Sequence, residues 1–210
     1  MQKVLYILSQ TLSIILHPLF MPTYGMILYM MVMQNRLSNL PSLYIWLSII
    51  GTSILTAIIP ISLIFILLKK GQIDSLHIEN SKQRTTPYIY TLICFCFWCY
   101  FLRVTMHLPH IWLFIAIGAT IALAIVMLIN HWWKISAHLT GMGGLLGGIC
   151  SMALFYTMLP SALIISVLIM SLLLMYARLY TNAHTPMQVV SGYLLGILCT
   201  FIPNLIIYYA

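Results

Sequence analysis

The stretch PHIWLFIAIGATIALAIVMLI, residues 109–129, is 21 residues long and contains no charged side chain. A helix of roughly 20 predominantly apolar residues is long enough to cross the hydrocarbon core of a bilayer. Similar runs lie between helix breakers along the rest of the chain, and we expect residues 1–16 to form either an interfacial helix or an extension of the first span broken at Pro18. Together the runs predict seven spans, at about 18–35, 43–68, 88–107, 109–129, 138–158, 161–177 and 187–208.

The composition agrees with this interpretation. Hydrophobic residues make up 62% of the chain and charged residues only 5%, whereas a soluble domain has roughly 25% charged residues. There is no linker, low-complexity tract or clear repeat, so we expect residues 1–210 to form a single domain. The sequence therefore predicts an all-α, polytopic transmembrane bundle of six to seven spans.

The formal charge of +7 arises mainly because the chain has only two acids, Asp74 and Glu79. A nucleic-acid-binding protein concentrates its basic residues on one solvated patch. Here the basic residues are scattered between spans, which excludes nucleic acid as a partner. With two acids, a metal centre bridged by carboxylates is not expected either.

Alternation of the spans places three polar segments on one side of the membrane, which we call side X. These segments are 69–87, 131–138 and 178–186, and they contain both acids and most of the polar groups suited to chemistry. The sequence therefore predicts a site at one membrane face.

The compartment that side X faces stays open. Seven basic residues fall on side X and only Arg36 and Arg103 on the other side, which the positive-inside rule would assign to the cytoplasm. Four of the seven are candidates for an anion site, and without them the bias is only three to two. The seven are Lys3, Lys69, Lys70, Lys82, Arg84, Lys134 and Arg178.

The third segment reads ARLYTNAHTPMQ, residues 177–188, with Arg178 and His184 separated by five residues. Arginine at a helix end can bind a phosphate bidentately, and the histidine can present a ring nitrogen to the same phosphorus. Thr185 and Pro186 suit the N-cap and first position of a helix, whose N-terminus favours an anion.

The other two segments also end at helix starts. His138 opens the fifth span, where Gly143/Gly147 and Gly144/Gly148 have the spacing that allows close helix packing. Lys82 and Arg84 come just before TTPY at the third span. Two arginines, two histidines and a lysine around one pocket suit a phosphate monoester or a diphosphate.

These segments resemble the type 2 phosphatidic acid phosphatase superfamily of integral-membrane lipid phosphatases. The family signature Ser-Arg-x5-His-x3-Asp resembles 177–188, Pro-Ser-Gly-His resembles ISAH at 135–138, and Lys-x6-Arg-Pro resembles HIENSKQRT at 77–85. The resemblance runs from about residue 69 to 200. It implies a metal-independent and cofactor-free hydrolase in the bilayer, expected in a bacterial cytoplasmic membrane.

The resemblance also implies residue roles. His184 would be the nucleophile that forms a phosphohistidine, and His138 the general acid that protonates the leaving oxygen. Arg84 and Arg178 would hold the phosphoryl oxygens, with Ser136 as a retained supporting residue. The implied partner is a phosphorylated membrane lipid, such as an undecaprenyl diphosphate or a phosphatidylglycerophosphate-like lipid.

Several positions depart from the family pattern. Gln188 stands in place of the aspartate that orients the nucleophile, and the lysine of the first signature falls on His77. Lys82 is a candidate to replace that lysine, and either Asp74 or Glu79 is a candidate to replace the missing carboxylate. An Asp-to-Asn change at the corresponding position of a serine-protease triad lowers kcat by about 10⁴.

Structural roles are the alternatives for individual residues. Thr185-x-x-Gln188 is a capping box, and Lys134 with the two neighbouring tryptophans suits an interfacial anchor. Asp74 is a candidate to pair with Lys69 or Lys70. The histidines at 17, 107, 110 and 131 lie near span ends and are expected to be ordinary interfacial or hydrogen-bonded imidazoles.

At the level of the whole protein, two functions stay open. The leading one is dephosphorylation of a lipid phosphate or diphosphate through a phosphohistidine. The alternative is a catalytically impaired homologue that binds or translocates a phosphorylated lipid, which Gln188 and the eroded first signature favour. The oligomeric state is open as well.

Overall fold

The apolar run at 109–129 forms helix α6 (His110–Ile129) in the computed structural model of the chain, which describes residues 2–36, 41–74, 81–155 and 160–209 and only the backbone of 35, 36, 81 and 82. Within these residues, seven helical stretches are long and apolar enough to cross a membrane. The sequence prediction of an all-α polytopic membrane protein is therefore confirmed.

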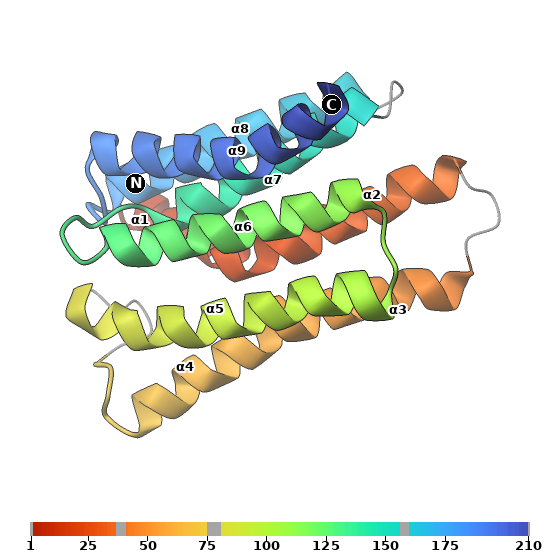
Figure 1. Cartoon of the computed structure of the whole chain (residues 1–210). Coiled ribbons are helices and arrows are strands. Elements are labelled where there is room, and N and C mark those ends of the chain that lie inside the picture. The colour runs from red at the N-terminus through yellow and green to blue at the C-terminus, as the bar shows by residue number, and fades with distance from the viewer. Residues whose placement is uncertain (1, 37–40, 75–80, 156–159, 210) are drawn as a thin grey trace.

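The helices bundle side by side along most of their length (Figure 1). Two stretches contain short π-helical segments, η2 (Ile54–Ile58) between α3 and α4, and η4 (Phe101–Thr105) after α5. The other helices are α1 (Gln2–Ile15), α2 (Met21–Arg36), α3 (Ser42–Ser53), α4 (Ile59–Lys69), α5 (Thr85–Tyr100), α7 (Ala137–Phe155), α8 (Ser161–Tyr180) and α9 (Pro186–Tyr209), with short 3-10 turns η1 (Pro18–Phe20) and η3 (Ser81–Arg84).

Prolines set several helix starts. Pro41, Pro109 and Pro160 are the residues directly before α3, α6 and α8, and Pro186 is the first residue of α9. Proline has no N–H to donate and a fixed φ, so the first turn of a helix accommodates it without losing a hydrogen bond. The observed starts lie within a few residues of those predicted from the apolar runs.

Helix α7 is the most buried of the candidate spans, and its most extensive contact is with α9. A Cβ added at Gly143 would meet the backbone of Tyr193, and one added at Gly196 would meet the backbone of Thr140. The two backbones therefore touch, as small residues at four-residue spacing allow in membranes. This contact fixes where the first residues of α7 and α9 lie relative to each other, which positions the site.

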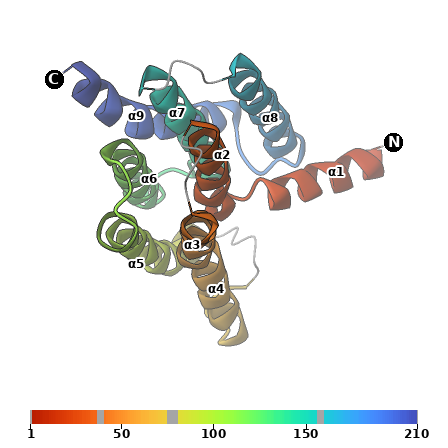
Figure 2. The ribbon, with the colours of Figure 1, turned by 90° about the vertical axis from the view of Figure 1, so that its right-hand side faces the viewer.

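Helix α1 leaves the bundle at a steep angle to α2, as Figure 2 shows in end view. The break falls at His17-Pro18, because proline disfavours helical backbone at the residue before it. The side of α1 that faces the protein carries the buried Ser9 and Ser13, whereas apolar residues such as Ile7 and Leu8 are exposed. An apolar outer face of this kind suits contact with lipid.

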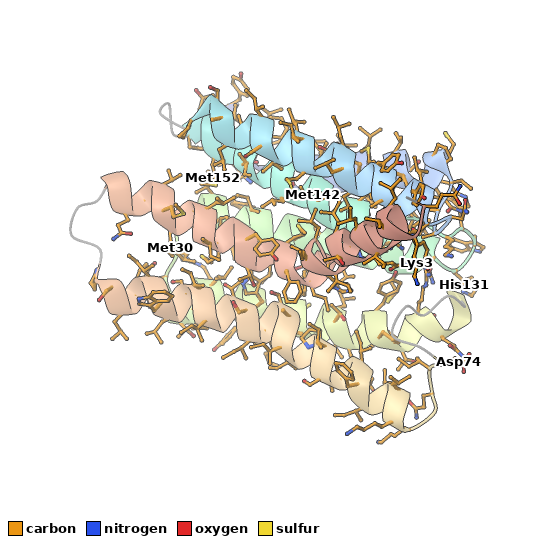
Figure 3. The ribbon with its side chains drawn as sticks, turned by 180° about the vertical axis from the view of Figure 1, so that it is seen from behind. Lys3, Met30, Asp74, His131, Met142 and Met152 are labelled. Carbon is orange, nitrogen blue, oxygen red and sulfur yellow. The ribbon has the colours of Figure 1, made fainter. Side chains whose placement is uncertain are left out.

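The described parts of the three polar segments of side X lie at one end of the bundle, where α5, α7 and α9 begin (Figure 1). Figure 3 shows Lys3, Asp74 and His131 at this same end, and Met30 and Met152 toward the other. The predicted alternation of the spans is therefore correct.

Candidate functional site

One cavity of about 540 Å³ among the helices has a lining that includes Arg84, His138, Arg178 and His184, the four residues that carried the sequence argument. Arg84 comes from the turn before α5, His138 from the first turn of α7, Arg178 from the last turn of α8, and His184 from the loop before α9. Residues from four distant parts of the sequence thus meet in one place.

Arg84, His138 and His184 lie at or just before the beginnings of α5, α7 and α9, and all three line the cavity. The first N–H groups of a helix have no partner within it, and the helix dipole adds a partial positive charge there. The guanidinium groups of Arg84 and Arg178 add full positive charges, so the cavity is electropositive. This environment favours an anionic ligand.

The two arginines are close enough to repel each other electrostatically. Arg84 also hydrogen-bonds the Tyr88 side chain, whereas the Nε of Arg178 is buried with no hydrogen-bond partner. Among the described residues, no carboxylate lines the cavity. Partly buried guanidinium groups without a nearby carboxylate are stabilised by an anion, so this pair suits an anionic ligand.

His184 is held by its Nδ1, which lies 3.2 Å from the backbone oxygen of Lys134 and 3.3 Å from Oε1 of Gln188. Gln188 Oε1 also accepts the Thr185 N–H at 3.1 Å, which fixes the orientation of the amide. Both neighbours of Nδ1 are acceptors, so Nδ1 carries the proton. Nε2 therefore keeps its lone pair, the form that a nucleophilic histidine requires.

Burial lowers the pKa of His184 to about 4, and the positive charge of Arg178 acts in the same direction. The hydrogen bond to Gln188 opposes this change but does not cancel it. His184 is therefore neutral at physiological pH.

The two alternatives for Gln188 prove compatible. Its side chain makes the reciprocal half of a capping box at the start of α9, and the same oxygen contacts His184. The backbone oxygen of Gln188 also accepts the Ser136 N–H at 3.2 Å, which ties the second polar loop to the third.

His138 is oriented by α1. Its Nε2 lies 3.1 Å from the backbone oxygen of Ser13, an acceptor, so Nε2 carries a proton and Nδ1 is the nitrogen that can exchange one. Its electrostatic neighbours are Arg178, His17 and His184.

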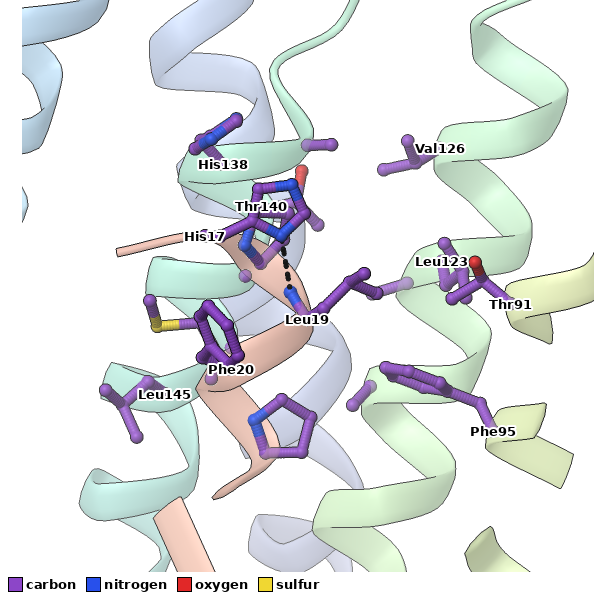
Figure 4. Close-up of a pocket in the computed structure, with 18 of the residues that line it drawn as sticks. His17, Leu19, Phe20, Thr91, Phe95, Leu123, Val126, His138, Thr140 and Leu145 are labelled. Carbon is purple, nitrogen blue, oxygen red and sulfur yellow. Dashed lines mark hydrogen bonds between the residues drawn. The ribbon is translucent and has the colours of Figure 1, made fainter. Parts of the chain in front are cut away.

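His17 belongs to the same cavity, although the sequence analysis assigned it an ordinary interfacial position. Its ring meets the His138 ring edge to face, with centroids 5.2 Å apart, and it lines the cavity. Figure 4 shows the two rings together, with Leu19 and Phe20 beyond His17. The sequence feature that could have indicated this position of His17 is the His17-Pro18 break inside an apolar run.

Beyond the histidines the cavity becomes apolar and penetrates deep into the bundle. Its lining along α7 extends from Ala137 to Met152, which at 1.5 Å per residue is about 20 Å. On α6 it extends from Val126 to Trp112, close to the opposite end of the bundle. We call this part, lined by residues such as Phe95, Trp112, Ile115, Ala122 and Met152, the apolar shaft.

The remaining predicted residues have different positions. Ser136 is fully buried, does not line the cavity, and its Oγ accepts the Leu139 N–H at 3.5 Å, in the first turn of α7. The backbone of Lys82 lies in η3, but its side chain is outside the described residues, as are His77 and Glu79 altogether.

Asp74 does not replace the missing carboxylate of the site. Its Oδ2 accepts a hydrogen bond from Gln83 Nε2 at 2.8 Å, outside the cavity, and the Nδ1 partners of His184 are Lys134 and Gln188. The sequence offered Lys69 or Lys70 as the partner of Asp74. In the described residues its carboxylate instead accepts a hydrogen bond from Gln83.

Within the described ranges, no three His, Cys, Asp or Glu side chains come together in a way that could hold a metal ion. No protein-family model, curated protein or solved structure matches the chain. The fold is that of an integral-membrane helical protein, and its function has to be argued from the site itself.

Proposed function

We propose that the protein dephosphorylates a membrane lipid phosphate or diphosphate through a phosphohistidine intermediate. The single observation that carries this proposal is the convergence of Arg84, Arg178, His138 and His184 on one cavity. The motif resemblance to type 2 phosphatidic acid phosphatases supports the same reaction, since these residues are the ones that its signatures align.

In the proposed reaction the lone pair of His184 Nε2 attacks the terminal phosphorus. The bond between phosphorus and the leaving oxygen breaks, and its electrons stay on that oxygen, which takes a proton from the protonated form of His138. Water then attacks the phosphorus of the phosphohistidine and gives a proton to His138. The bond between phosphorus and His184 Nε2 breaks, its electrons return to Nε2, and inorganic phosphate is released. Arg84 and Arg178 stabilise the charge on the non-bridging oxygens.

The apolar shaft supports a lipid rather than a soluble phosphate ester as substrate. The shaft begins at the histidines and extends about 20 Å along α7, through much of a hydrocarbon core that is about 30 Å thick. Burying an apolar chain there contributes about 0.8 kcal/mol per methylene relative to water. A chain drawn from the bilayer would align its phosphate with the arginines.

A second candidate is a lipid-binding or lipid-translocating protein without turnover. It is favoured by Gln188, because a neutral amide stabilises an imidazolium less than a carboxylate does. The phosphate-binding groups and the shaft would serve this role equally well.

Phosphate release by the detergent-purified protein separates the two candidates. A panel of lipid phosphates and diphosphates is tested with the unmodified chain, with His184→Ala and with His131→Ala, a matched control because His131 is exposed at the same end of the bundle and does not line the cavity. We expect release that falls to background only in His184→Ala. Binding of these lipids without release from any of them would favour the second candidate.

A further inference from the structure

His17 is placed in the site by the break between α1 and η1. Its backbone is extended, with φ −67° and ψ 139°, and its Nδ1 accepts the Leu19 N–H at 3.4 Å as the N-cap of η1. In the neutral ring the proton is therefore on Nε2. His17 thus combines a structural nitrogen, Nδ1, with a donor, Nε2–H.

His17 is a direct neighbour of His138 in the cavity. The two rings meet with centroids 5.2 Å apart, and both residues line the cavity together with Arg178 and His184. Leu19 and Phe20 follow His17 toward the apolar shaft, as Figure 4 shows.

The contact between His17 and His138 matters for the substrate because attacking and leaving groups are roughly in line in phosphoryl transfer. With His184 on one side of the phosphorus, the leaving oxygen lies on the His138 side. The lipid continues from that oxygen into the apolar shaft and passes His17. In a lipid monophosphate the next atom is carbon, but in a lipid diphosphate it is the phosphorus of a second, charged phosphate.

We propose that His17 binds the lipid-linked phosphate of a diphosphate through Nε2–H, so that the site prefers a lipid diphosphate over the monophosphate with the same chain. This inference rests on the proposed function. The products are inorganic phosphate and a lipid monophosphate that leaves with the proton supplied by His138. A donor at this point stabilises the negative charge on the leaving phosphate as the bond breaks.

Two substitutions test the two ring nitrogens of His17 separately: Nδ1, which accepts the Leu19 N–H, and Nε2, which carries the proposed donor. In His17→Asn the amide oxygen can occupy the position of Nδ1 and keep the cap, since asparagine is a good N-cap residue, but nothing reaches the position of Nε2. In His17→Gln the longer side chain brings an N–H to the position of Nε2. His131→Asn is the control for the same chemical change at an exposed histidine.

The measured quantity is the ratio of kcat/KM for a prenyl diphosphate to that for the prenyl monophosphate of the same length. We expect the unmodified protein and His131→Asn to favour the diphosphate. His17→Asn should lower the ratio on the order of tenfold, the effect of losing one hydrogen bond to a charged group, and His17→Gln should keep most of it. Equal losses on both substrates in His17→Asn would overturn the inference and leave the proposed function standing.

Binding provides a readout that does not need turnover. Methylenediphosphonate and inorganic phosphate are titrated against the same variants. We expect His17→Asn to weaken binding of the diphosphonate more than that of phosphate. If no lipid is hydrolysed but this difference is found, the proposed function fails and the assignment of His17 stands; equal affinities in all variants would refute the assignment.

Discussion

Gln188 stands where the lipid phosphatase signature has an aspartate. Its neutral amide oxygen contacts the Nδ1–H of His184. The orientation of the ring and its tautomer need only an acceptor, and a second one comes from the Lys134 backbone. What glutamine lacks is the negative charge that stabilises the imidazolium. The arrangement therefore keeps His184 neutral, with a lone pair on Nε2.

The pH dependence of turnover follows from this arrangement. Since the pKa of His184 is about 4, and protonation removes the nucleophile, the acid limb of kcat/KM due to His184 should lie near pH 4. In Gln188→Asp a carboxylate beside the ring stabilises the imidazolium and raises this pKa, so the limb should move to higher pH. Profiles of kcat/KM against pH that coincide for the two proteins would contradict this account of Gln188.

The sequence predicted residues that share a motif or follow from the alternation of the spans, and missed those that depend on how α1 packs and on backbone groups. Arg178 and His184 are separated by one short loop, so their proximity follows from the chain itself. His17 and Ser13 reach His138 only because α1 bends at Pro18 and returns across the end of the bundle. The contact of the Lys134 backbone with His184 could not be predicted either, because any residue type has a carbonyl.

At the scale of the elements, the contact between α7 and α9 decides where His138 and His184 lie relative to each other. The glycine spacing in the sequence predicted a close contact but not which of the two glycine pairs makes it. Gly143 and Gly147 face the backbone of α9, whereas a Cβ on Gly144 would meet only a methyl group of Thr200 at 3.6 Å and one on Gly148 would meet Ile115 of α6.

Adjacent glycines of α7 provide a matched test of this contact. Gly143→Ala should destabilise the protein by about 1–3 kcal/mol, because the added methyl group collides with the backbone of Tyr193. Gly144→Ala should be neutral or stabilising, since alanine favours helix by about 1 kcal/mol over glycine. Thermal unfolding in detergent measures both, and equal midpoints for the two variants would show that α7 and α9 do not pack in this way.

The apolar shaft makes a separate prediction about chain length. Ala122 is 3% exposed and lines the shaft, so Ala122→Phe should obstruct it and lower turnover of long-chain lipid phosphates more than that of short-chain ones. Ile121→Phe is the control, because Ile121 is 46% exposed on the outer side of the same helix. Turnover assays with a series of chain lengths test this; a uniform loss across the series in Ala122→Phe would exclude the shaft as the site of the chain.

At the scale of the whole molecule, the polar residues of the candidate site lie together at one end of the bundle. The alternation of the spans, read from the sequence, was enough to place the three polar segments together. The sequence could not predict the cavity between these segments, because the shape of the cavity depends on how α1, α5, α6 and α7 pack around it.

Labelling of single cysteines tests this sidedness. In a background from which the five native cysteines are removed, Asp74→Cys and His131→Cys should react with a membrane-impermeant maleimide from the same side of sealed vesicles. His110→Cys, at the start of α6, should react only from the other side, because its helix begins at the opposite end of the bundle. Reaction of all three from one side would refute the arrangement of the spans.

The central claim is that His184 attacks a phosphoryl group bound by Arg84 and Arg178. The most direct measurement is to quench the protein in base during turnover of a lipid diphosphate labelled in its terminal phosphate, and to locate the label by mass spectrometry. We predict an acid-labile phosphohistidine at residue 184, absent in His184→Ala. Phosphate release with no label on His184 at any time during turnover would contradict the account.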